Sequence, residues 1–165
     1  MEKNPFKISR LYNAPPDLVW KAHTELEHLK QWCGPGGFTS KTARLDFRVG
    51  GSYHYCVIAP GGIELWGMFV YREITPKTKL VMVVSFSDEA GGMTRNPFSP
   101  EWPLEVLNTM TFTEEGTKTR LTLEGYPINA TDKERATYTL AYESMGQGYK
   151  GTLDNLEEHL ARIQN

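Results

Sequence analysis

Cysteine and excess charge are both scarce in this sequence. Its 165 residues include two cysteines, Cys33 and Cys56, which form neither a CxxC motif nor a cluster with histidines. This spacing argues against a disulfide framework and favours a reducing, cytoplasmic setting. The 18 basic and 20 acidic residues leave a formal net charge of −2, which lacks the electrostatic footprint expected of a nucleic-acid-binding protein.

Long apolar runs are missing as well. The longest covers residues 80–84, far fewer than the roughly 20 residues that a membrane-spanning helix requires. The N-terminus carries no apolar run of the signal-peptide type, so we expect neither a membrane span nor a targeting segment. With 39% hydrophobic and 12% aromatic residues, the chain is expected to fold as a single domain over residues 1–165.

The first forty residues predict a strand followed by two short helices. Apolar and polar residues alternate over 6–12, which is typical of a strand. Pro16 is well suited to begin a helix that extends to His23. Thr24 and Glu27 then have the spacing of a capping box, which predicts the start of a second short helix that the glycines of 34–37 end.

Strands dominate the middle of the chain. Short turns separate them, which favours an antiparallel meander over a parallel sheet with crossover helices. The long connection 88–103 is expected either to cover a cavity as a lid or to mediate self-association, so a homodimer is one possible partner arrangement. The expected strands are 38–48, 52–58, 63–74, 80–87, 104–113 and 118–126.

The end of the chain predicts a long amphipathic helix. Residues 131–134 form a capping box, and an apolar stripe recurs at steps of three and four from Met145 to Ile163. Gly146, Gly148 and Gly151 predict either a break or a close approach to another surface. The expected fold is therefore α+β, with a curved seven-stranded antiparallel sheet wrapped around the C-terminal helix and two short helices after the first strand.

Several strings resemble the SRPBCC superfamily of START-like, helix-grip domains. Residues 8–15 followed by Val19-Trp20-Lys21-Ala22 are similar to its opening. Three later features are similar to the branch named for the activator of the heat-shock chaperone ATPase. These are Trp32-Cys33-Gly34-Pro35, residues 47–51 with Trp66-Gly67, and the C-terminal string 147–156, where Tyr149 stands at a place more commonly held by tryptophan.

This resemblance implies a general class of function and leaves alternatives open. Superfamily members hold lipids, sterols, plant hormones or polyketides between helix and sheet, and a minority are cyclases or hydrolases. The resemblance thus implies binding of a small apolar or amphipathic molecule, with an enzyme or a chaperone-interacting module as alternatives. The activators use an additional N-terminal domain for which this chain has no room, so by itself it is not expected to stimulate a chaperone ATPase.

The aromatic residues are the main candidates for cavity contacts as a set, whereas for any single one packing in the core is favoured. The strand 63–74 has two mixed faces, and if Trp66 and Met68 face inward, Arg72 would offer a guanidinium to an anionic head group. His54 is a further candidate as an inward-facing acid or base. The candidate ligand-binding residues are Trp20, Trp32, His54, Trp66, Met68, Phe86, Trp102, Met110, Phe112, Met145, Tyr149 and Leu153.

Motifs for metal binding or covalent catalysis are not visible. The histidines His23, His28, His54 and His159 show no HExxH-like spacing, and the sequence has no GxSxG elbow. The glycine pairs lack the lysine and the strand-to-helix context of a phosphate-binding loop. We therefore expect no metal and no cofactor, and we assign no catalytic residue.

Overall fold

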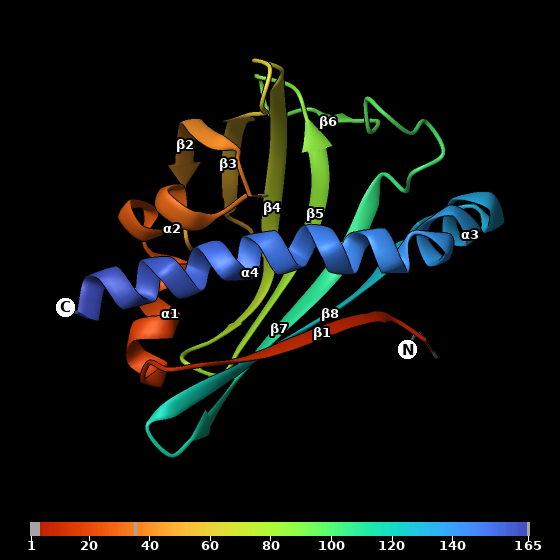
Figure 1. Ribbon diagram of the computed structural model, residues 1–165. Helices are drawn as coiled ribbons and strands as arrows, with labels where there is room; N and C mark the ends of the chain where they lie inside the picture. The colour runs from red at the N-terminus through yellow and green to blue at the C-terminus, as the bar shows by residue number, and fades with distance from the viewer. Residues whose placement is uncertain (1–3, 35, 165) are drawn as a thin grey trace.

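A curved antiparallel sheet carries the helices on its concave face, with α4 crossing the sheet and α1 and α2 near one end of that helix (Figure 1). The computed structural model describes residues 4–34 and 36–164. Its elements are β1 (Phe6–Tyr12), α1 (Pro16–Thr24), α2 (Leu26–Trp32), β2 (Thr39–Leu45), β3 (Ser52–Ile58), β4 (Glu64–Thr75), β5 (Lys79–Ser87), β6 (Met93–Thr94), β7 (Glu105–Glu115), β8 (Lys118–Ile128), α3 (Asp132–Leu140) and α4 (Tyr142–Gln164).

The strands from β2 to β8 follow the predicted meander, and β8 then pairs with the first strand of the chain, β1. Its order is β1-β8-β7-β5-β4-β3-β2, and all the pairs are antiparallel. The β1 strand lies beside β8 with Phe6 opposite Gly125, so the first and last strands are neighbours. The predicted seven strands form this path. A further strand, β6, pairs only with β5 inside the connection 88–103 and is too short to leave a periodic pattern.

The two predicted capping boxes have different outcomes. At α3, the Glu134 backbone N–H donates to Thr131 Oγ1 at 3.1 Å, which confirms that box as the N-cap. The box predicted at Thr24 is wrong, because Thr24 is still the last residue of α1 and its hydroxyl donates back to the Trp20 carbonyl oxygen at 2.9 Å. Glu25 stands at the start of α2 without a side-chain cap.

The C-terminal helix breaks before its glycines rather than at them. The chain turns at Ala141 between α3 and α4, and Gly146, Gly148 and Gly151 all lie inside α4. The apolar stripe buries Leu153, Leu156 and Leu160 against the core. None of the helices in the described part of the chain is long and apolar enough to cross a bilayer.

A close approach of backbones joins α4 to the loop after α2. An added Cβ at Gly151 would lie 3.2 Å from the Gly36 backbone nitrogen, which confirms the predicted close approach at this glycine. The Gly34 carbonyl oxygen accepts hydrogen bonds from Thr152 Oγ1 at 3.0 Å and Asn155 Nδ2 at 3.1 Å. Two strings that are more than a hundred residues apart in sequence therefore hold each other in place beside the cavity.

Candidate functional site

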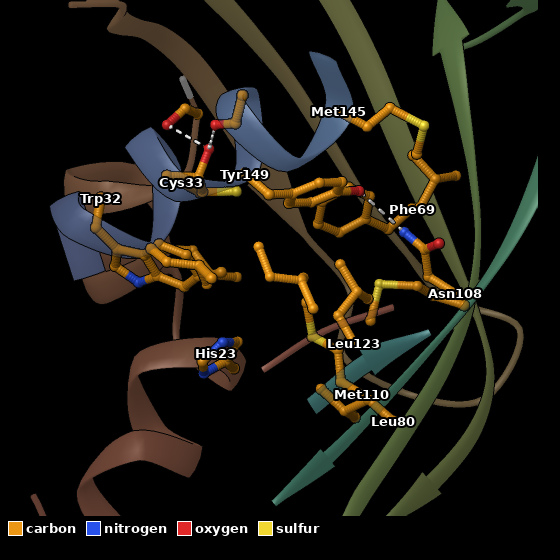
Figure 2. Close-up of a pocket in the computed structure, with 18 of the residues that line it drawn as sticks. His23, Trp32, Cys33, Phe69, Leu80, Asn108, Met110, Leu123, Met145 and Tyr149 are labelled. Atoms are coloured by element: carbon orange, nitrogen blue, oxygen red, sulfur yellow. Dashed lines mark hydrogen bonds between the residues drawn. The ribbon is translucent and has the colours of Figure 1, made fainter. Parts of the chain in front are cut away.

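An apolar cavity of about 580 Å³ lies between α4, the loop after α2 and the concave face of the sheet (Figure 2). This volume is within the range of roughly 300–1,000 Å³ found for small-molecule sites. Aromatic and aliphatic side chains make up most of its wall. The residues around this main lobe include Ile8, Leu29, Trp32, Cys33, Tyr55, Phe69, Tyr71, Leu80, Met82, Met110, Leu121, Leu123, Met145, Tyr149 and Leu153.

A smaller side lobe of about 310 Å³ adjoins the main one toward Trp102 and the β6–β7 connection. Trp102 packs against Tyr138 with ring centroids 5.2 Å apart, which places it under this lobe. Both lobes share the same partition, formed by Gly34, Tyr55, Val84, Phe86, Asn108, Met145 and Tyr149.

Strand pairing decides which face of β4 looks into the cavity. Gly67, Phe69 and Tyr71 line the main or side lobe, while Met68 alternates with them and does not. The Trp66 ring lies 5.1 Å from the His54 ring on the other face, although Trp66 also borders the side lobe. The face with Phe69 and Tyr71 is thus the concave one. The candidate Met68 is wrong as a cavity residue, while Trp66 reaches only the edge of the side lobe.

Arg72 does not serve the cavity. It occupies the register shift between Tyr71 and Glu73 in the pairing of β4 with β5, and it is exposed. The condition under which Arg72 would offer a guanidinium to a ligand is therefore not met, and Arg72 is not among the described lining residues. His54 also lies away from the cavity, where its Nε2 is 3.0 Å from the Asp88 carbonyl oxygen.

The structure brings together a majority of the candidates named from the sequence. Trp20 and Phe112 pack against each other in the core, with ring centroids 5.4 Å apart, and line neither lobe. His54 and Met68 lie on the opposite face of the sheet. The candidates that do line a lobe are Trp32, Trp66, Phe86, Trp102, Met110, Met145, Tyr149 and Leu153.

The sequence reasoning missed the polar residue at the partition. Asn108 lies on β7, buried at 5% exposure, and its Nδ2 donates to Tyr149 Oη at 3.4 Å. Its period-two spacing to Met110 and Phe112 puts all three on the concave face. The available signal for Asn108 is a polar residue at a position where the alternation of the strand places apolar ones. The sequence does not reveal its role, because a buried amide needs a hydrogen-bond partner and only the fold supplies that partner.

His23, at the base of the cavity, is uncharged at neutral pH. Burial lowers the pKa of its imidazole to about 4, opposed by the hydrogen bond that Nδ1 donates to the Val19 carbonyl oxygen at 2.8 Å. The other ring nitrogen, Nε2, is buried and makes no hydrogen bond. Since Nδ1 carries the proton in this neutral ring, Nε2 is left as an acceptor.

The other ionisable groups of the wall are neutral as well. Burial raises the pKa of the Cys33 thiol to about 12 and raises the pKa of the Tyr149 phenol, the latter opposed by Asn108. The same cause raises the pKa values of Tyr55 and Tyr71. Among the described residues that line either lobe there is no aspartate, glutamate, lysine or arginine.

A metal centre is not assembled within residues 4–34 and 36–164, where no three side chains of His, Cys, Asp or Glu converge. Two histidines do meet away from the cavity. One hydrogen bond of 2.9 Å joins His28 Nδ1 on α2 to His159 Nε2 on α4. This pair links the two helices.

Gly67 gives a direct test of the cavity wall. An added Cβ would lie 2.4 Å from Tyr55 Oη and 2.6 Å from its Cζ, so Gly67→Ala is expected to push this ring into the lobes. We expect a loss of about 1–3 kcal/mol in the free energy of unfolding, as for other overpacked sites. Urea titration measures it. Gly148→Ala, where the added methyl meets open space, is the control and should stabilise α4. A Gly67→Ala protein as stable as wild type would contradict this geometry.

A curved antiparallel sheet wraps around a long C-terminal helix, and an apolar cavity lies between the two. This arrangement defines a helix-grip protein. The family model described as "Activator of Hsp90 ATPase homolog 1-like protein" matches residues 13–161, and the chain belongs to this family. No functionally curated protein matches the sequence.

Solved structures share the fold at low sequence identity. A protein from Arthrobacter aurescens is 22% identical with a TM-score of 0.77, over 98% of this chain and 90% of its own. One from Nitrosomonas europaea is 20% identical with a TM-score of 0.75, over 99% of each chain. The AHSA1 protein from Silicibacter pomeroyi is 15% identical with a TM-score of 0.70, over 97% of this chain and 99% of its own. At these identities the likeness concerns the fold alone.

Proposed function

We propose that this protein binds a small apolar or amphipathic molecule in the cavity between α4 and the sheet. The observation that carries the proposal is the cavity itself, about 580 Å³ with a wall of mainly aromatic and aliphatic side chains. Protein interiors are normally packed with few voids larger than a water molecule. A void of this size in the centre of the fold is therefore best explained by a ligand that fills it.

The chemistry of the wall favours binding over catalysis. A general acid or base works best when its pKa lies near the working pH. The pKa of His23, at about 4, and that of Cys33, at about 12, are both far from neutrality. The cyclase or hydrolase alternative would need an activated group that the described lining residues do not supply.

A neutral fluorescent naphthalene tests the proposal. N-phenyl-1-naphthylamine should bind the wild-type protein with one site and an increase in fluorescence. Val84→Trp places a large side chain on the partition between the lobes and should weaken binding by at least tenfold. Thr109→Trp, on the outer face of β7, is the control and should bind as wild type does.

Native mass spectrometry of the purified protein complements this titration, because a co-purified molecule would appear as a mass shift that Val84→Trp removes. Absence of dye binding in the wild type, or equal binding by Val84→Trp, would contradict the proposed function.

A further inference from the structure

Tyr149 and Asn108 form a polar pair on the wall that both lobes share. Tyr149 extends from α4 toward Asn108 on β7, while His23 and Trp32 lie toward the other side of the cavity (Figure 2). Asn108 Nδ2 donates to Tyr149 Oη at 3.4 Å. Because the hydroxyl oxygen accepts this hydrogen bond, its own proton is directed away from Asn108 and remains available to another acceptor.

Three other polar side chains of the main lobe donate their hydrogens within the protein. Thr152 Oγ1 and Ser144 Oγ each donate to a backbone carbonyl oxygen at 3.0 Å, and His23 Nδ1 does so at 2.8 Å. Each donor is therefore already satisfied. The phenols of Tyr55 and Tyr71 also line the main lobe. Tyr149 differs from all of these groups because its hydroxyl accepts a hydrogen bond from Asn108, which orients the phenol and leaves its own proton to donate.

Charge is absent from the part of the wall that the structure describes. No cationic side chain lines either lobe to pair with a carboxylate, sulfonate or phosphate, and no anionic one to pair with an amine. Burying an unpaired charge is far more costly than burying a neutral group of the same size. A charged ligand inside this wall would meet no charged partner and would lose the water that hydrates it.

We propose that the cavity selects an uncharged molecule that carries a hydrogen-bond acceptor, such as a ketone or ester carbonyl, and that Tyr149 Oη–H donates to this acceptor. Asn108 acts as a positioning residue, since its amide fixes the direction of the phenol. The apolar body of the ligand then lies against Met110, Leu123 and their neighbours. This inference rests on the proposed function and adds the class of ligand.

Two dyes with the same ring system test the requirement for neutrality. N-phenyl-1-naphthylamine is 1-anilinonaphthalene-8-sulfonate without its sulfonate, so the pair differs in one charged group. We expect the neutral dye to bind the wild-type protein at least tenfold more tightly. Equal affinity for the two dyes would overturn the selection for uncharged ligands.

Two further naphthalenes test the hydrogen bond. Prodan carries a ketone, and 6-propyl-2-(dimethylamino)naphthalene is its analogue without the carbonyl oxygen. Tyr149→Phe should weaken Prodan binding about tenfold, the equivalent of one lost hydrogen bond of 1.4 kcal/mol, and should leave the analogue unchanged. Tyr126→Phe makes the same change on the outer face of β8, at a residue that lines neither lobe, and is the matched control, expected to leave both affinities unchanged.

The outcomes separate this inference from the proposed function. If none of the three neutral dyes binds the wild-type protein, the proposed function fails. If Prodan and its analogue bind but Tyr149→Phe weakens both equally or neither, or Tyr126→Phe weakens Prodan binding as much as Tyr149→Phe does, the cavity binds and the assignment to Tyr149 is wrong. The emission spectrum of Prodan bound to the wild-type protein is a further test that needs no variant. A red-shifted, hydrogen-bonded emission is expected, and emission at the position seen in hydrocarbon solvent would overturn the inference.

Discussion

Replacing Leu156 with alanine is expected to lower the free energy of unfolding by about 4 kcal/mol, whereas Leu153→Ala should cost only about 2 kcal/mol. Both leucines belong to the buried stripe of α4, and their exposed fractions are 0% and 6%. Leu156 packs in the core away from the cavity, while Leu153 lines the main lobe. A side chain that already borders empty space has fewer contacts to lose when it is truncated.

Urea denaturation of the two variants beside the wild type measures this difference. Because both substitutions are Leu→Ala in the same helix, the intrinsic helix propensities cancel. Saturating N-phenyl-1-naphthylamine should stabilise the wild type and Leu156→Ala by similar amounts. Equal costs for the two substitutions, with no stabilisation by the dye, would mean that the lobe is filled by neighbouring side chains.

Acidification from pH 7 to pH 4 is expected to remove about 3 kcal/mol of stability through His23 alone. Burial lowers the pKa of this imidazole from its ordinary value of 6.5 to about 4. Between these values the unfolded chain binds a proton that the folded protein does not, so stability falls as the pH falls through this window. At 1.36 kcal/mol for each pKa unit, the difference amounts to about 3 kcal/mol.

His23→Leu is the control variant, since leucine cannot titrate. Urea denaturation at several pH values should show a steep loss of stability below pH 6.5 for the wild type and a shallower one for His23→Leu. Burial and, to a smaller extent, the nearby His28 also lower the pKa of His159. This lowers the stability of both proteins at acid pH by the same amount, so it cancels in the comparison. Parallel pH profiles for the two proteins would contradict a neutral, buried His23.

Local patterns predicted those features that depend on neighbouring residues. The strands 6–12 and 52–58 are found with the predicted bounds, because alternation is a property of the chain itself. The N-cap at Thr131 is confirmed for the same reason, since its partner is three residues away. Thr24 has the same spacing to Glu27, yet it ends α1 instead. A capping box is informative only when the preceding helix has already finished.

The sequence by itself determined the order of the elements, the antiparallel meander and the amphipathic stripe of the last helix, because each depends on contacts or periods of a few residues. Only the tertiary structure decided which face of β4 is concave and thus that Phe69 and Tyr71, not Met68, look into the cavity. It also joined Asn108 to Tyr149 across 41 residues. Alternation defines two faces of a strand, but the pairing of the strands and the position of α4 determine which one surrounds the cavity.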